Sequence, residues 1–185
     1  MRKTLTFSIV ALLAVSCGSS KTTSTAAATT AKPSAASVTT RAPAASAAPE
    51  TAGELPKVTG ETTAKPVIAM PKSAAPAKLV VDVLKAGTGA EVKAGQNIKV
   101  HYIGQIWTTG ETFDASWDRG EPIEFPIGKG SVIKGWDEGL VGQKIGSRVL
   151  LVIPPDKGYG ANGRPPKIKG TDTMVFVVDI IDSKA

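Results

Sequence analysis

Hydrophobic residues in the C-terminal part of the chain form short runs separated by turn-forming residues. Residues 98–103 alternate, which predicts a half-buried strand with Val100 and Tyr102 on one face. His101 lies on the opposite face, where a lone histidine is typical of a surface or structural position, so we assign it no chemistry. Similar runs predict further strands at 79–84, 112–113, 123–125, 148–153 and 174–181.

The same pattern predicts one short helix, which begins near Ser131 as N-cap and carries apolar residues at helical spacing as far as Leu140. Gly135 and Gly139 lie inside it, although a glycine costs a helix about 1 kcal/mol relative to alanine. We therefore expect this helix to approach a flat surface closely. The chain is predicted to be α+β, with a mainly antiparallel sheet of five or six strands around one short helix.

The N-terminus has the pattern of a secretory signal over residues 1–16, with Arg2 and Lys3 followed by an apolar run. That run is too short to span a bilayer permanently. The segment ending at Cys17 is similar to a bacterial lipobox and predicts lipidation of this cysteine, whereas Ala14 and Ser16 would equally suit an ordinary signal peptidase. We expect an exported lipoprotein on the outer side of the cytoplasmic membrane, with lipid as its only membrane contact, and otherwise a secreted protein.

Residues 17–77 have the composition of a surface stalk. Of the 60 residues 18–77, 42 are Ala, Thr, Ser or Pro and none is aromatic. Such a stretch lacks the apolar surface needed to offset the entropy of ordering. We expect it to be disordered, and residues 78–185 to fold alone.

Charge and residue type exclude several functions for residues 78–185. The 14 basic and 13 acidic side chains of this region imply no basic face for nucleic acid. One Cys and one His in the whole chain leave too few ligands for a metal site and argue against a nucleophilic triad. The run Gly158–Gly163 matches the G-x-G-x-x-G pattern of dinucleotide-binding loops, but the prolines on both sides prevent a helix from beginning there. The sequence therefore predicts neither a cofactor nor a metal.

Five separated motifs between residues 79 and 181 carry a resemblance to a known family. They are Val100-His101-Tyr102-Ile103-Gly104, Phe113-Asp114-Ala115-Ser116, the run Gly128–Trp136, Gly158-Tyr159-Gly160, and Val175-Phe176. Their order and spacing resemble the FKBP family of peptidyl-prolyl cis-trans isomerases. The resemblance implies a twisted antiparallel sheet half-wrapped round one helix, with an apolar pocket between them.

The resemblance also implies a role for each matching residue. Asp114 and Tyr159 would be the catalytic polar groups at the rim, with Arg119 orienting Asp114. The Tyr159 hydroxyl and the backbone N–H of Ile133 would contact the bound peptide. Trp136 would form the floor of the pocket. The walls and remaining binding positions would be Tyr102, Phe113, Ile123, Val132, Ile133, Ile168 and Phe176.

We therefore expect an enzyme that rotates X-Pro bonds of exported proteins by apolar binding and desolvation, without a cofactor. The alternative is a module that binds proline-containing segments, or acts as a chaperone, with little turnover. Expected partners are proline-containing segments of unfolded or folding proteins and macrolides of the FK506 and rapamycin type, bound by a monomer. Ile123, Arg164 and Lys167 depart from the family pattern at the rim. The two cations would favour acidic or polar peptides.

Overall fold

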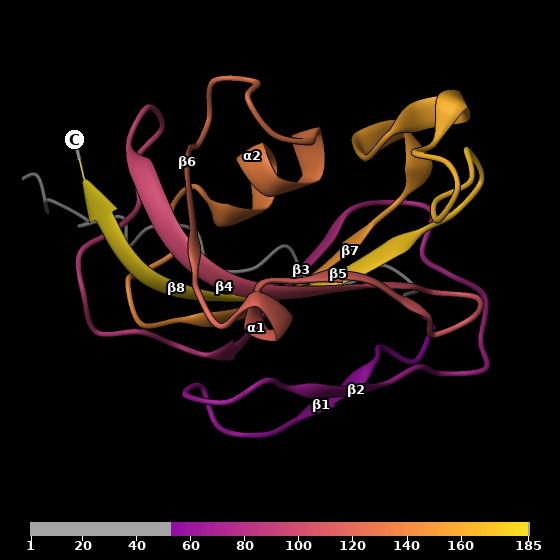
Figure 1. Ribbon diagram of the computed structural model, residues 1–185, viewed down its shortest axis with the longest axis horizontal. Helices are drawn as coiled ribbons and strands as arrows, with labels where there is room; N and C mark the ends of the chain where they lie inside the picture. Colours follow the sequence, from indigo (N-terminus) through magenta and orange to yellow (C-terminus); the bar gives the residue numbers. More distant parts are fainter. Residues whose placement is uncertain (1–52, 185) are drawn as a thin grey trace, which may run out of the picture. The chain divides into compact units, whose positions relative to one another are not determined.

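The alternating runs form a six-stranded antiparallel sheet in the computed structural model, which describes residues 53–184 (Figure 1). The strands run in the order β3-β7-β8-β4-β5, with β6 also paired to β4. Their bounds are β3 Val80–Lys85, β4 Asn97–Ile106, β5 Thr112–Ala115, β6 Ile123–Pro126, β7 Arg148–Ile153 and β8 Met174–Lys184. The predicted α+β fold is confirmed.

Strand β4 organises the sheet because it pairs with three others. It runs antiparallel to β8 along its whole length, while β6 pairs with its first half and β5 with its second half. Gly104 of β4 consequently lies between Asp114 of β5 and Phe176 of β8. This register brings residues from three separated motifs to one end of the sheet.

Helix α2, Lys134–Leu140, lies on one face of the sheet, and its glycines explain how closely it approaches. A Cβ atom on Gly135 would lie 2.6 Å from the Ile153 side chain, and one on Gly139 would lie 2.6 Å from the Leu151 side chain. The predicted close contact with a sheet is thus confirmed. A larger residue at either position would force the Ile153 or Leu151 side chain to shift.

The helical elements differ from the prediction in two respects. The N-cap of α2 is Ile133 rather than Ser131, because the Asp137 carboxylate accepts hydrogen bonds from the amides of Gly128 and Gly130 and holds the preceding loop outside the helix. In addition, α2 is not the only helix. A single α-turn, α1 (Ser116–Arg119), follows β5, and two 3₁₀ turns, η1 (Pro155–Lys157) and η2 (Gly160–Asn162), lie in the long loop after β7.

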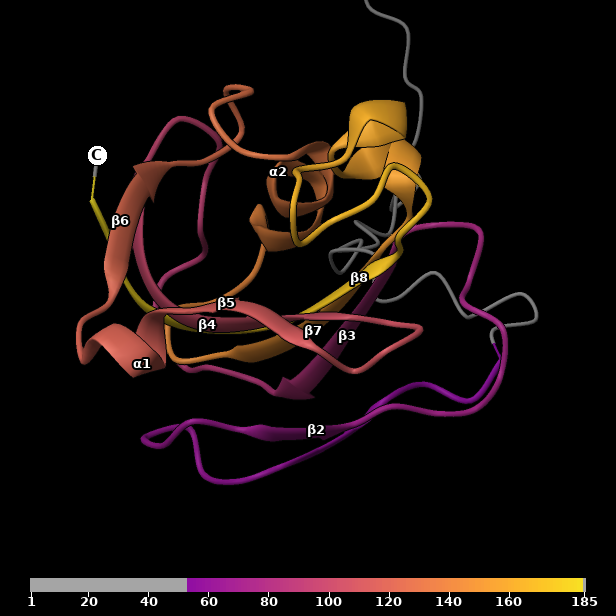
Figure 2. The ribbon, with the colours of Figure 1, turned by 45° about the vertical axis from the view of Figure 1, so that its right-hand side comes forward.

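The segment that precedes residue 78 is the largest departure from the prediction. Residues 53–77 are not a structureless stalk: β1 (Lys57–Thr59) and β2 (Val67–Ala69) form a hairpin on the sheet face opposite α2 (Figures 1 and 2). Ile68 of β2 is buried in a second hydrophobic cluster with Ile103, Trp107 and Leu150 of the sheet region. The hairpin therefore covers apolar surface that the sheet would otherwise expose.

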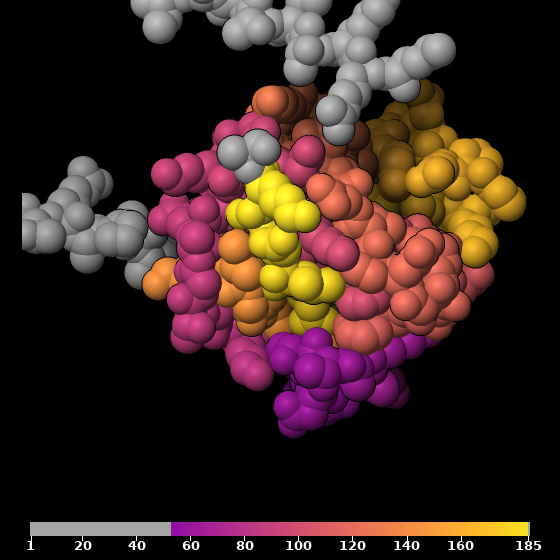
Figure 3. All heavy atoms as spheres, turned by 60° about the vertical axis from the view of Figure 1, so that its left-hand side comes forward, coloured from indigo at the N-terminus to yellow at the C-terminus, as the bar shows by residue number. Residues whose placement is uncertain are grey.

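Polar contacts also hold the hairpin on the sheet. Arg148 of β7 and Asp179 of β8 form a buried ion pair, with Arg148 Nε donating to Asp179 Oδ1 at 2.6 Å. Arg148 Nη2 also donates to Asp179 Oδ2 at 2.7 Å. The guanidinium reaches the hairpin loop as well, where Nη1 lies 2.7 Å from the Gly60 carbonyl oxygen and Nη2 lies 3.1 Å from that of Ala64. The indole N–H of Trp107 donates to the Ser73 carbonyl at 3.0 Å. Figure 3 shows the hairpin, in indigo, seated against β8, in yellow.

The folded part of the chain therefore begins before residue 78, where the sequence analysis placed its boundary. Residues 53–184 fall within one compact unit. The predicted signal segment 1–16, Cys17 and the rest of the stalk up to residue 52 lie outside the described residues. Among residues 53–184, no helix has the length and hydrophobicity needed to cross a membrane.

His101 lies on the same sheet face as the hairpin and away from Tyr102, as the alternation predicts. Its ring stacks on Trp117 with the ring centroids 4.0 Å apart, and its Nδ1 lies 3.0 Å from the Ser116 hydroxyl. Burial lowers its pKa, and this outweighs the opposing effect of Asp179. These contacts indicate a structural role for His101, which does not line the pocket at the end of the sheet.

Candidate functional site

A pocket of about 950 Å³ opens between helix α2, the end of the sheet and the loop between β7 and β8. Trp136 of α2 forms its floor and is only 5% exposed. The rings of Tyr102 and Phe176 meet this indole edge-on, with centroids 5.3 and 5.2 Å from it, and the Phe125 ring is tilted against it at 5.1 Å. Edge-on packing of this kind stabilises aromatic pairs beyond simple burial. The floor is thus rigid and apolar.

One wall of the pocket can form only because residue 104 is a glycine. Phe113 of β5 and Phe176 of β8 meet edge to face over this glycine, with their centroids 5.4 Å apart. A Cβ atom at position 104 would lie 2.5 Å from the Phe113 ring and 2.8 Å from the Phe176 ring. Glycine is therefore required here for the two phenylalanines to close the wall.

A polar network occupies the rim on the side of β4 and β5. The Tyr102 hydroxyl donates to Asp114 Oδ2, and Arg119 Nη1 donates to Asp114 Oδ1 at 2.5 Å. Arg119 Nη2 also donates to the Tyr102 hydroxyl oxygen at 3.1 Å. Both carboxylate oxygens of Asp114 are therefore engaged by neighbouring side chains.

This network sets the charge states of its three members. Burial alone would raise the pKa of Asp114, but the hydrogen bonds from Tyr102 and Arg119 and the positive charge of Arg119 outweigh burial and lower it. Burial and the bond to Asp114 raise the pKa of Tyr102. Hydrogen bonds to Tyr102 and Asp114 raise the pKa of Arg119. At neutral pH the site therefore holds an aspartate anion, a neutral tyrosine and an arginine cation.

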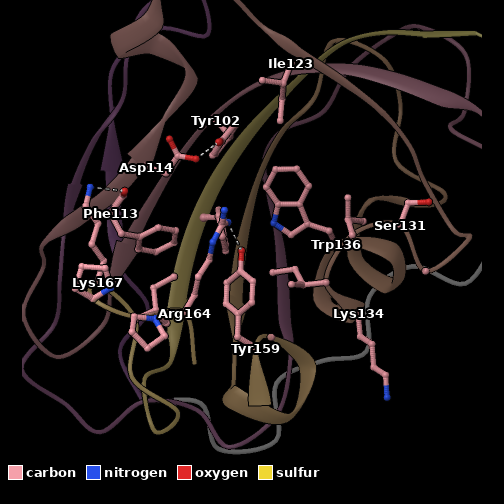
Figure 4. Close-up of a pocket in the computed structure, with 18 residues that line it drawn as sticks. Tyr102, Phe113, Asp114, Ile123, Ser131, Lys134, Trp136, Tyr159, Arg164 and Lys167 are labelled. Carbon is pink, nitrogen blue, oxygen red and sulfur yellow. Dashed lines mark hydrogen bonds between the residues drawn. The ribbon is translucent and has the colours of Figure 1, made fainter. Parts of the chain in front are cut away.

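Two donors face the pocket from its other side. Tyr159, at the start of η2, accepts a hydrogen bond from Arg164 at 3.3 Å, which leaves its own hydroxyl proton free to donate (Figure 4). The amide of Ile133 makes no hydrogen bond within the described part of the chain, because it lies just before the first turn of α2. A bound carbonyl could accept from either group.

The structure brings nearly all the residues predicted for the site to this one pocket. Arg119 is the exception: it lies outside the lining and contacts the pocket residues Asp114 and Tyr102 instead. Lining the pocket are Tyr102, Phe113, Asp114, Ile123, Val132, Ile133, Trp136, Tyr159, Ile168 and Phe176.

Apart from the rim cations Arg164 and Lys167, sequence reasoning did not anticipate the other lining residues. Pro165 and Pro166 form the tip of the loop after β7 and reach the pocket because Arg164 and Ile168 pair through both backbone hydrogen bonds. The length of that loop was the only available signal. Gly130, Ser131, Lys134 and Gly158 also line the pocket, chiefly because they neighbour predicted residues. Among residues 53–184, no group of His, Cys, Asp and Glu is placed to hold a metal ion.

Comparison with known proteins identifies the class of this site. The sequence profile of the FKBP-type peptidyl-prolyl cis-trans isomerases matches residues 89–181. The chain is 43% identical to an FK506-binding protein of Streptomyces anulatus over 63% of its own length and 95% of that protein. It is also 43% identical to a probable FK506-binding protein of Corynebacterium glutamicum, over 64% of this chain and 98% of that protein.

A solved structure agrees with the sequence relatives. The crystal structure of AtFKBP13 is 36% identical, with a TM-score of 0.54 over 59% of this chain and 95% of that chain. The chain therefore belongs to the family of FKBP-type peptidyl-prolyl cis-trans isomerases. Its activity is the cis-trans isomerisation of peptide bonds that precede proline.

Proposed function

We propose that the pocket accelerates rotation about X-Pro bonds by binding the prolyl ring on Trp136 and withholding water from the bond. The main supporting observation is a buried aromatic floor with hydrogen-bond donors at the margin, among them the Tyr159 hydroxyl and the Ile133 amide. Rotation about a C–N bond requires no nucleophile.

The physical argument concerns the charge distribution of the amide. Resonance between nitrogen and carbonyl separates charge in the planar peptide and opposes rotation by about 18–20 kcal/mol. At the twisted state the nitrogen is pyramidal and the charge separation is smaller. Phe113, Trp136 and Phe176 replace water around the bond and thus disfavour the planar form relative to the twisted one. Lowering the barrier by about 6 kcal/mol would accelerate rotation about 10⁴-fold.

The polar groups at the rim would position neighbouring side chains and the bound peptide. An ionised carboxylate accepts hydrogen bonds and cannot donate one, so Asp114 is not a donor to the twisting carbonyl. Its two bonds instead hold the Tyr102 ring against Trp136 and keep Arg119 beside the rim. Tyr159 and the Ile133 amide would supply the hydrogen bonds that keep the peptide in place while it turns.

The charge states predict a rate that is independent of pH near neutrality. Between about pH 6 and pH 8, Asp114 stays ionised because its pKa is lowered, and Tyr102 stays neutral because its pKa is raised. NMR exchange measurements on an X-Pro peptide across this range should give a flat profile. A bell-shaped profile centred near neutrality, or an inactive His101→Asn variant, would contradict a mechanism based on shape and desolvation.

The same assay separates catalysis from simple binding. An isomerase accelerates exchange between cis and trans signals when it is present in small amounts relative to peptide. A chain that binds the peptide at the pocket without accelerating exchange would instead be a proline-binding or chaperone module.

By similarity to the FK506-binding relatives, we also propose that the pocket accepts macrolides of the FK506 and rapamycin type. Ile123 and the rim cations Arg164 and Lys167 would modify that affinity.

We further propose that the chain acts on exported proteins as a lipoprotein anchored through Cys17. The support is the order of charged, apolar and small residues before the single cysteine of the chain. Cys17→Ser is expected to move the protein from the detergent phase to the aqueous phase in a partition experiment and to release it from membranes. An unsubstituted protein that is found soluble with an unmodified Cys17 would favour the secreted alternative.

A further inference from the structure

Two cations flank the proline pair at the tip of the loop after β7. Arg164 and Lys167 are exposed and stand on either side of Pro165 and Pro166. The backbone under them is anchored: the Arg164 amide donates to the Ile168 carbonyl at 2.7 Å, and the Ile168 amide donates back at 3.1 Å. Since Ile168 is buried in the pocket wall, both cations are held at the mouth of the pocket.

Neither cation is neutralised by a carboxylate of residues 53–184. Arg164 donates to the Tyr159 hydroxyl and lies over its ring, 5.7 Å from the centroid, while Lys167 Nζ donates to the Phe113 carbonyl at 3.0 Å (Figure 4). Within residues 53–184, no ion pair includes either of them. Asp114, the one acidic residue of the lining, is instead paired with Arg119.

The mouth of the pocket thus carries excess positive charge on one side. Lys134 also belongs to the lining, but its side chain runs away from the pocket in Figure 4. The excess therefore comes from Arg164 and Lys167. Both are partly hydrated and make only neutral hydrogen bonds, so a carboxylate would be a stronger partner for each.

We propose that Arg164 and Lys167 select peptides with an acidic residue immediately before the proline, an inference that rests on the function proposed above. This proposal takes the prolyl ring to bind on Trp136 and the preceding carbonyl to accept from the Tyr159 hydroxyl rather than from the Ile133 amide. Arg164 is hydrogen-bonded to that same hydroxyl. Consecutive Cα atoms are about 2.9 Å apart across a cis bond and about 3.8 Å apart across a trans bond, so in either isomer the preceding residue stays close enough for its side chain to reach this rim. A guanidinium can hold its carboxylate through two parallel hydrogen bonds.

The test compares N-capped peptides of the form Ala-Xaa-Pro-Phe, with Xaa as Glu, Gln, Leu or Lys, using the full chain. Glu and Gln have nearly the same shape, so the ratio of their kcat/KM values isolates charge. Two exposed ion-pair contacts predict a ratio of about five in favour of Glu at low salt, with Lys below Gln. The ratio should approach one near 1 M salt, where the screening length falls to about 3 Å.

Substitutions at Arg164 and Lys167 test whether these two side chains cause the preference for Glu before the proline. Arg164→Gln combined with Lys167→Gln should bring the Glu to Gln ratio to about one, and the double Arg164→Glu, Lys167→Glu variant should make Lys the better residue. Lys169→Gln is the matched control, because Lys169 is exposed in the same loop but outside the pocket lining. This control should keep the wild-type ratio.

The outcomes separate this inference from the proposed function. Failure to accelerate any of the four peptides would overturn the function itself. Acceleration of all four with equal rates for Glu and Gln at low salt would overturn the acidic preference alone. A preference for Glu that survives the double glutamine variant would also overturn the inference.

Discussion

Removing residues 53–77 should lower the melting temperature of the protein by roughly 10 °C. The hairpin buries Ile68 and Pro56 and half-buries Leu55, Val58 and Met70 against the sheet. Burying one such aliphatic side chain stabilises a fold by about 1.5–3 kcal/mol, and the entropy of ordering the segment offsets part of the sum. A net loss of about 3 kcal/mol corresponds to this shift for a domain of this size. Thermal unfolding of residues 53–185 and 78–185, followed by circular dichroism, measures the difference.

Point variants in β2 provide the control for this deletion. Ile68 is 8% exposed, whereas the adjacent Val67 is 67% exposed. Ile68→Ala should therefore cost about 2–3 kcal/mol of unfolding free energy, and Val67→Ala should stay within about 0.5 kcal/mol of the wild type. Equal stability of these two variants, together with an unchanged melting temperature on deletion, would show that the hairpin contributes nothing to the fold.

The second large effect concerns the wall of the pocket. Phe113→Ala should lower kcat/KM about thirtyfold, because it removes a half-buried ring that packs against Phe176 and opens the wall to water. A loss of about 2 kcal/mol of transition-state stabilisation corresponds to that factor. Tyr159→Phe should lower kcat/KM only about three- to tenfold, since one neutral hydrogen bond contributes about 0.5–1.5 kcal/mol. Peptide exchange measured by NMR gives both values.

Phe113→Leu serves as the matched control for the wall, because leucine retains most of the apolar surface. Its kcat/KM should lie between those of the wild type and the alanine variant. Thermal unfolding of each variant verifies that the fold is intact at the assay temperature. An inactive Tyr159→Phe beside a fully active Phe113→Ala would indicate that a hydroxyl group, rather than the apolar wall, carries the catalysis.

Much of the sheet and of the site could be predicted from the sequence because the signals are local or lie at regular spacing. Period-two alternation placed Tyr102 and His101 on opposite faces, as the structure confirms. The glycines of α2 indicated its approach to the sheet before any contact was known. The resemblance of five motifs then supplied the pocket residues, which no local pattern could have assembled.

The hairpin was not predicted because residues 18–77, taken together, have the composition of a disordered stalk, which hides the two short apolar runs. Within that stretch, the runs around Val58 and Ile68 are each three residues long and are separated by residues that include Gly60. Such short strands have no stability by themselves. They fold only because the apolar face formed by β4, β7 and β8 lies beneath them and Arg148 binds the intervening loop.

The sequence alone determined the fold class, the strands of the six-stranded sheet and the family, since each depends on residue types at particular separations along the chain. Only the tertiary structure decided that Arg148 and Asp179 meet in the sheet and fasten the hairpin. It likewise decided that Asp114 is neutralised by Arg119 while Arg164 and Lys167 have no carboxylate partner within the described residues. Arg148 and Asp179 are 31 residues apart, and Asp114 and Arg119 belong to different elements, so these charges become significant only after folding sets the distances between them.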